Sequence, residues 1–504
     1  MLRFLFAPKL HLSNASKKFN VGQEHQLTFV TQKSGTGFVG KTIIEKLLRS
    51  CPDVKRIIIL LRGKKGKSIE ERIADYKQQV IFSLIQKSDP SSLDKIIGIE
   101  GDLSSGTWSV PDDAKLKSEL ESVNVIFHCA ASVRFDDSLQ KAILINVCGT
   151  KAILDFAKTL KKLDVFMHVS TAYSNCDRLK IEEKIYPAHV DWRTTIKIAK
   201  LIDEDTLNAL FAKYSSNMAN TYVFAKHVAE CMVNDYKDEL PLIIFRPSIV
   251  TSAEVEPLPG YIDSFNGPMG LMVATAIGIN RTSWQSHEAA INATPVDLCV
   301  KGIVIAASKR PKPGDEIKIY NAASIKTTKY VDAVKQGKRY CVTKAPPNMF
   351  FWRPGGRLTE NYYEFYLRLV FTQLIPAAIA DVMLHLMNKK TFFLKLQRAL
   401  INAQTSLHYF MNNVWDIKND NFLQLSHDVP PEEYNDFNLK EVYPDYIDYG
   451  SLCMLGARRF LLNWPDKDLE KGKRNLQIAI WIDKIVKYTF FFVIFWILYT
   501  KYVK

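Results

Sequence analysis

The sequence has no Cys-x-x-Cys pair and no zinc-finger spacing among its eight cysteines. Such pairs are typical of structural zinc sites, and regularly spaced cysteines are typical of the disulfide frameworks of secreted proteins. Their absence argues against both. We therefore expect free thiols, no bound metal, and an active portion that faces a reducing compartment, the cytosol.

Signals for secretion and for nucleic-acid binding are also missing. The first twenty residues are basic and contain no acid, but their apolar run is too short and broken for a secretory signal, with a weak transit peptide as the alternative. Residues 1–22 are thus an extension without an assigned fold. The net charge of +14 is spread along the chain without an arginine-rich arm, which predicts no nucleic-acid partner and is compatible with an anionic lipid surface or anionic substrates.

The composition is that of a globular protein, with 47% hydrophobic and 24% charged residues in a chain of 504. In the first half, short and nearly all-apolar runs alternate with longer segments of helical period, such as 40–49 and 139–160. Apolar runs of this kind are typical of strands buried on both faces of a parallel sheet. The pattern predicts an α/β fold, a Rossmann-type doubly wound parallel sheet with strands at 27–31, 56–61, 96–100, 125–129, 165–169 and 242–245.

The second half changes character twice. Residues 247–337 are irregular and rich in proline and glycine, which favours a substrate-facing subdomain within a first domain spanning 23–345. A loop with several prolines and glycines at 345–357 predicts a domain boundary. Beyond it, residues 357–460 are expected to form a mostly α-helical C-terminal domain.

A hydrophobic segment lies at the C-terminus, at 485–501. Its thirteen uncharged residues, 488–500, are flanked by Lys487 and Lys501 and rich in aromatic side chains. A simple membrane crossing needs about 20 residues, so this segment is short for one. We expect contact with membrane lipid and leave open a tail anchor, shallow insertion, or a hairpin with 369–388.

A glycine-containing turn after the first predicted strand is the candidate nucleotide site. Gly37 and Gly40 stand directly before a helix, where glycine lets the backbone approach a pyrophosphate and the helix start binds an anion. The first glycine of this pattern is replaced by Ser34, and the turn is longer than usual. Arg62 ends the second strand, where NAD-binding proteins carry an acid, and it suits a 2′-phosphate instead. The sequence therefore favours NADPH over NADH.

Two further strand ends supply groups for the cofactor. Asp102, followed by Leu103, stands where a carboxylate can accept from the adenine amino group, although an ordinary strand-end turn explains it equally well. The fourth strand ends in Ala130 and Ala131, which let a cofactor lie close to the backbone.

The chemistry is predicted at two hydroxyls and a tyrosine–lysine pair. Ser170 and Thr171 follow the fifth strand at the carboxyl edge of the sheet, where ligands of such sheets bind. Tyr222 and Lys226 are four residues apart on one face of a predicted helix. A nearby ammonium is expected to lower the phenol pKa, so that Tyr222 can protonate a carbonyl oxygen while NADPH supplies hydride to the carbon.

With these residues in place, the chain resembles the fatty acyl-CoA reductases, an extended short-chain dehydrogenase/reductase family, and most of all the insect-type members with a male-sterility-like C-terminal domain. The resemblance runs from about residue 27 to the C-terminus. The motifs that carry it are GTGFVGKTIIEKLLRSCPDVKRIIILLR, GDLSS, FHCAASVRFD, NVCGT, FMHVSTAYSNC, FRPSIV, EPLPGYIDSFNGP, PVD at 295–297 and WDIKNDN at 415–421.

The resemblance implies NADPH-dependent reduction of a long-chain fatty acyl-CoA through an aldehyde to a fatty alcohol, at the endoplasmic reticulum or peroxisome. It also implies Thr171 as the active-site hydroxyl with Ser170 as fallback, Tyr222 as the acid and Lys226 as its partner. The implied cofactor contacts are Gly35, Thr36, Gly37, Phe38, Val39, Gly40, Arg62, Asp102, Leu103, Ala130, Ala131, Val169, Tyr222, Lys226, Pro247, Ser248 and Ile249.

Two departures from the family pattern affect these expectations. The family has F-V-T-G-G-T-G-F where this chain has FVTQKSGTGF, so either the pyrophosphate loop is altered at 32–34 or those residues come from a mispredicted exon junction. Asn292 replaces an acid before PVD. Two alternative functions follow: an extended reductase or epimerase acting on a sterol or nucleotide sugar, and a non-catalytic lipid-binding relative that no longer accepts NADPH.

Overall fold

Seven parallel strands form the central sheet, in the order β12-β7-β5-β4-β1-β2-β3. The computed structural model describes residues 26–30, 37–63, 66–103, 114–324, 327–439 and 446–502. The predicted extension 1–22 and the altered loop 32–34 lie outside these ranges. The strands are β1 (Gln26–Val30), β2 (Val54–Leu61), β3 (Ile96–Glu100), β4 (Val125–His128), β5 (Val165–Val169), β7 (Leu242–Pro247) and β12 (Lys318–Ala322).

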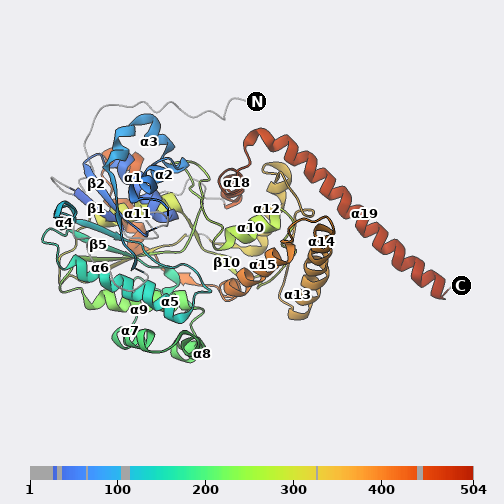
Figure 1. Cartoon of the computed structure of the whole chain (residues 1–504), viewed down its shortest axis with the longest axis horizontal. Coiled ribbons are helices and arrows are strands. Elements are labelled where there is room, and N and C mark those ends of the chain that lie inside the picture. Colours follow the sequence, from blue (N-terminus) through green and yellow to red (C-terminus); the bar gives the residue numbers. More distant parts are fainter. Residues whose placement is uncertain are drawn as a thin grey trace.

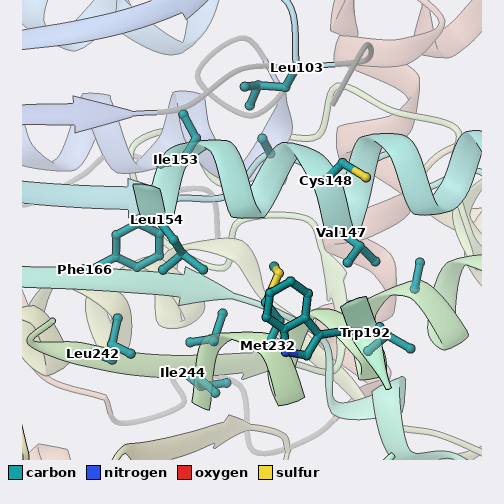
Figure 2. Packing of buried hydrophobic residues seen from close by; sticks show 14 of the residues in the cluster. Leu103, Val147, Cys148, Ile153, Leu154, Phe166, Trp192, Met232, Leu242 and Ile244 are labelled. Atoms are coloured by element: carbon teal, nitrogen blue, oxygen red, sulfur yellow. The ribbon is translucent and has the colours of Figure 1, made fainter. Parts of the chain in front are cut away.

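Alternate residues of β2, β4, β5 and β7 enter different cores, which explains the apolar runs. In β2, Ile57 and Ile59 belong to a core that includes α1 (Phe38–Ser50) and α11 (Val296–Ala307), whereas Ile58 belongs to the core on the opposite face. The opposite core holds α5 (Leu139–Ile143), α6 (Gly149–Ala157) and α9 (Thr221–Asp235). Figure 1 shows helices on both faces of the sheet, and Figure 2 shows Phe166 of β5 beside Leu154 of α6. The predicted doubly wound sheet is confirmed.

The remaining helices divide between the sheet and a second lobe. Those that flank the sheet or its connections are α2 (Ile69–Lys77), α3 (Ser83–Ser88), α4 (Ala114–Glu121), α7 (Trp192–Leu201), α8 (Glu204–Tyr214), α16 (Asp420–Gln424) and α17 (Tyr434–Phe437). The second lobe contains α10 (Pro268–Ala276), α12 (Tyr330–Thr343), α13 (Tyr362–Leu369), α14 (Ile375–Leu386), α15 (Phe393–Leu407), α18 (Tyr446–Gly456) and the start of α19 (Leu469–Tyr502).

The predicted subdomain at 247–337 differs from the structure. Helix α11 and strand β12 lie within that range, yet both belong to the Rossmann part, because α11 covers one sheet face and β12 pairs with β7. The strand was missed because its five residues KIYNA include a polar asparagine. Asn321 is wholly buried, and its side chain donates to the carbonyl of Lys418 in the C-terminal region.

The predicted boundary at 345–357 also differs from the structure. Helices from both sides of it share small cores: Ala276 of α10 and Cys341 of α12 pack with Met454 of α18, and Ala274 packs with Leu400 of α15. The strands β9 (Thr282–Trp284) and β14 (Arg357–Thr359), which lie on opposite sides of the predicted boundary, also pair in parallel. The second lobe is therefore built from two separated stretches of chain.

The WDIKNDN segment ties the C-terminal region back onto the Rossmann part. Its β15 (Asp416–Ile417) pairs with β6 (Lys180–Ile181), and Trp415 donates to the carbonyl of Cys176 at 3.2 Å. The carboxylate of Glu183 accepts from the backbone of Asn321 at 2.8 Å and of Asn421 at 2.6 Å. This motif thus has a structural role in docking.

Helices α13 and α14, which have many exposed apolar side chains, lie on the side of the molecule where α19 extends away from the second lobe (Figure 1). In the part of the chain that the structure describes, one helix is long and apolar enough to cross a membrane, the continuous helix Tyr362–Leu386, and 22% of its most apolar 18-residue window is buried. The segment predicted at 485–501 forms the end of α19, where the side chains from Tyr488 onward are exposed.

We expect Gly456→Ala to destabilise the protein, because a Cβ at this position would lie 1.8 Å from the carbonyl oxygen of Gly260. Overpacking of this kind costs about 1–3 kcal/mol of unfolding free energy. Gly450→Ala in the same helix is the matched control, since a Cβ there meets nothing within 4 Å. Thermal unfolding of both variants checks this, and equal melting temperatures would contradict it.

Candidate active site

A large cleft opens at the carboxyl ends of the strands, beside β1, where the strand order reverses between β2 and β4. Ligands of doubly wound sheets bind at this reversal. The cleft encloses about 2020 Å³ of empty space, part of it open to solvent. Its walls come from the start of α1, the ends of β4, β5 and β7, helix α9, the loop 262–268, and three side chains from beyond the Rossmann core, Tyr330, Leu407 and Phe410.

The start of helix α1 forms one end of the cleft. Gly37 is its N-cap in extended conformation, with no side-chain capping hydrogen bond and no acid in the first turn. The first N–H groups of a helix have no partner within it, so this end suits an anion such as a pyrophosphate. Gly37, Phe38, Val39 and Gly40 line the cleft as predicted, whereas Gly35 and Thr36 lie outside the described residues.

Lys226 and Tyr222 both line the cleft from α9, but they do not interact as the sequence suggested. The Lys226 side chain is 1% exposed, and its ammonium donates to the carbonyl of Val169 at 2.7 Å. Burial lowers the pKa of Lys226 to about 8. Burial also raises the pKa of Tyr222, and the group that lowers it is the Thr171 hydroxyl, not the ammonium. The predicted lowering of the phenol pKa by Lys226 is therefore not seen.

The two candidate hydroxyls face different partners. Thr171 Oγ1 accepts from the Tyr173 amide at 3.3 Å and donates to the carbonyl of Pro247 at 3.4 Å, and this hydroxyl lowers the pKa of Tyr222. Ser170 Oγ is buried without a hydrogen bond of normal geometry, and it lowers the pKa of Glu230 instead. The contact with Tyr222 favours Thr171, the first choice, as the hydroxyl that acts with the acid. Phe135 stacks on the other side of Tyr222, with ring centroids 5.7 Å apart.

A buried ion pair below the cleft was missed by the sequence analysis. Arg246 of β7 is wholly buried and donates to Glu230 of α9 at 2.6 and 3.0 Å, while Ser174 donates to the same carboxylate at 2.9 Å. Burial opposes ionisation of Glu230, but the guanidinium more than offsets it and the pKa stays below its ordinary value. A signal was present, since Tyr222, Lys226 and Glu230 recur every four residues on one helical face.

The predicted cofactor residues divide into two groups. Ala131, Val169, Pro247, Ser248 and Ile249 line the cleft together with the catalytic candidates. Arg62, Asp102, Leu103 and Ala130 do not: Leu103 is buried in the core against Gly149, and Ala130 is also buried. Arg62 and Asp102 form a half-exposed ion pair of 3.0 Å where the neighbouring strands β2 and β3 end.

Within the described residues, no group of three or more His, Cys, Asp or Glu side chains is arranged to hold a metal ion. All eight cysteines are free thiols. The fold and the cleft are those of a nicotinamide-dependent oxidoreductase, in which a Rossmann sheet positions the cofactor.

Within that class, the chain belongs to the fatty acyl-CoA reductase family. Two family models described as male sterility protein match residues 34–303, more than half of the chain, and 372–464. Fatty acyl-CoA reductase 1 of Xenopus laevis is 33% identical over 446 residues, which cover 88% of this chain and 86% of that protein. Fatty acyl-CoA reductase 2 of Mus musculus is 32% identical over 448 residues, with the same coverage.

Solved structures with a similar fold are reductase domains of large synthetases. The terminal R domain of the myxalamid PKS-NRPS pathway has a TM-score of 0.59 at 17% identity and covers 86% of this chain and 90% of its own. The R domain of a nonribosomal peptide synthetase from Mycobacterium tuberculosis has a TM-score of 0.53 at 15% identity, with coverages of 87% and 92%. These likenesses concern the fold, including much of the second lobe.

We expect Tyr222→Phe to lower turnover by about 100- to 10,000-fold, the usual loss when a general acid is removed, while cofactor binding is retained. The matched control is Tyr236→Phe at the end of the same helix, whose hydroxyl donates to Asp155 far from the cleft. Steady-state kinetics and cofactor titration check both variants. A Tyr222→Phe enzyme of near-normal activity would show that another group supplies the proton.

Proposed function

We propose that this protein reduces long-chain fatty acyl-CoA through the aldehyde to a primary fatty alcohol, with NADPH as reductant. The observation that carries the proposal is that Thr171, Tyr222 and the buried Lys226 line one cleft at the carboxyl edge of the sheet. Relatives named fatty acyl-CoA reductase, 33% identical over most of the chain, support the substrate class.

The residues of the cleft have different roles in the proposed reaction. Thr171 and Tyr222 face the carbonyl oxygen of the substrate, and the Tyr222 phenol donates a proton to it. NADPH, when bound, supplies the hydride that the carbonyl carbon receives. Lys226 holds its ammonium at the end of β5 through Val169, where it can bind ribose hydroxyls.

Two such reductions balance the reaction. The first adds a hydride and a proton to the thioester carbonyl, and the carbon–sulfur bond then breaks to release CoA thiol and an aldehyde. The second adds a hydride and a proton to the aldehyde and gives the alcohol. The same proton donor serves both steps, because both build charge on the same carbonyl oxygen.

The direct test is to incubate the purified protein, in detergent or vesicles, with palmitoyl-CoA and NADPH and to identify products by mass spectrometry. We expect fatty alcohol, with two NADPH oxidised for each alcohol formed. Oxidation of NADPH without aldehyde or alcohol would overturn the proposed function. Reduction of a sterol or nucleotide sugar in place of palmitoyl-CoA would assign the chain to another reductase activity.

The preference for NADPH is proposed from Arg62. Its guanidinium lies where β2 ends, beside Asp102, so both contact the adenosine end of a bound cofactor. We expect Arg62→Ala to weaken NADPH binding by about 10- to 100-fold, as for loss of a charge-assisted hydrogen bond, and to change NADH binding little. Arg56→Ala on the same strand, which breaks an exposed pair with Glu119, is the control. Equal losses for both cofactors in Arg62→Ala would contradict the assignment.

We also propose that the protein binds a membrane through the end of α19. Asp483 is buried at the base of this segment, where it accepts from Trp352 at 2.7 Å and pairs with Lys487 at 2.7 Å. Beyond it, consecutive apolar side chains from Phe490 to Trp496 are exposed around the helix. A helix that is apolar all round requires apolar surroundings, and α14 exposes further apolar residues on the same side of the molecule (Figure 1).

We expect removal of residues 488–504 to release the protein from phospholipid vesicles in a flotation assay while leaving its thermal unfolding unchanged, since these side chains contact no core. Hexanoyl-CoA reduction by the truncated protein is the control for an intact active site. A truncated protein that still floats with vesicles would transfer the membrane contact to Tyr362–Leu386.

A further inference from the structure

A second cavity lies between helices α10 and α12 of the second lobe. It is a narrow, partly open cavity whose walls are mainly apolar. Pro268, Leu271 and Thr275 line it from α10, and Tyr330, Ala333 and Gly337 line it from α12. Both sets recur every three or four residues, so one face of each helix is turned towards the space. We call this cavity the side channel.

The side channel adjoins the catalytic cleft. Pro268, Tyr330 and Leu407 line both, so these three side chains form the wall where the two cavities meet. Lys338 and Gly356, which are partly exposed, also line the channel. The channel therefore extends from the wall of the cleft into the second lobe.

Three polar side chains along the channel bond to one another. Asn280 donates to the hydroxyls of Thr275 at 3.1 Å and Ser283 at 3.3 Å, and its own oxygen accepts from Gln404 at 2.9 Å. Gln285 also lines the channel, and its buried Nε2 makes no hydrogen bond to a described residue, but the rest of the wall is mainly apolar. The channel suits a long, thin apolar chain.

Gly337 is the residue that keeps the middle of the channel open. It lies inside α12, where glycine weakens a helix relative to alanine, and a Cβ at this position would meet nothing within 4 Å. No close packing therefore requires glycine here. A large side chain at this position would project into the channel, two helical turns or about 10 Å along the axis from Tyr330.

We propose that the side channel holds the acyl chain of the substrate, with its thioester at Tyr222 and its methyl end towards Lys338, and that Gly337 determines how long a chain is accepted. This proposal rests on the proposed function and adds the place of the chain. Each methylene buried in an apolar wall strengthens binding by about fourfold, so a filled channel favours long chains strongly. Because the channel shares Pro268, Tyr330 and Leu407 with the catalytic cleft, we assign the substrate chain, rather than a separate lipid, as its occupant.

The test compares chain lengths in Gly337 variants of the full-length protein. We expect Gly337→Phe to lower kcat/KM for palmitoyl-CoA by about tenfold or more, as overpacking does, with hexanoyl-CoA little affected because its short chain ends before Gly337. Lys335→Phe places the same side chain on the exposed face of the same helix and should change neither activity.

NADPH titration of each variant separates a blocked channel from a misfolded protein, and Ala333→Phe repeats the block one turn earlier along the same face. Equal losses for both substrates in variants that bind NADPH normally would overturn the proposal, as would no loss for either. A protein that reduces neither acyl-CoA before any substitution would refute the proposed function instead. Palmitate that competes with neither substrate but fills the channel would indicate a separate lipid site and would also overturn the proposal.

Discussion

The buried ion pair between Arg246 and Glu230 is the constraint on which the geometry of the active site depends. It joins β7 to α9, and Ser174 adds the turn that follows β5. These three elements carry Pro247, the Tyr222–Lys226 pair and Thr171. Removing one partner of a buried pair leaves an uncompensated charge and lowers the free energy of unfolding by about 3–5 kcal/mol. Substitution of either residue alone is therefore expected to destabilise the protein. The pair fixes where the Tyr222 phenol lies relative to the strand ends.

The second lobe completes this site rather than standing beside it. Tyr330, Leu407 and Phe410 close the cleft, and the side channel runs between α10 and α12. The lobe is held in register by the WDIKNDN segment, whose backbone binds Glu183 and β6. Asp297 of PVD has a comparable role, because its carboxylate accepts from three successive amides at 254–256 and fixes the loop that leads to α10. The WDIKNDN and PVD motifs are thus explained by the contacts with which they hold other parts of the chain in place.

The sequence predicted those features correctly that depend on residues close together in the chain. The strands of the sheet could be predicted because burial on both faces demands continuous apolar runs, as in the strand 165–169. Tyr222 and Lys226 could be paired because four residues make about one helical turn. Strand β12 could not be found, since Asn321 is buried through a bond to Lys418, almost a hundred residues away. The predicted domain boundary at 345–357 differs from the structure for the same reason. A proline- and glycine-rich loop indicates a turn, but its own residues do not show that the helices on either side of it pack together.

The sequence by itself determined the sheet, the helix that carries the tyrosine and lysine, and the positions of most cleft residues, because periodicity and strand-end placement are local properties. The tertiary structure alone decided that Lys226 bonds to Val169, that burial raises the Tyr222 pKa, and that Thr171 rather than Ser170 meets the phenol. It also decided that two stretches of chain form one lobe with a channel between them. Burial and contact depend on residues brought together from distant positions, and no local pattern contains that information.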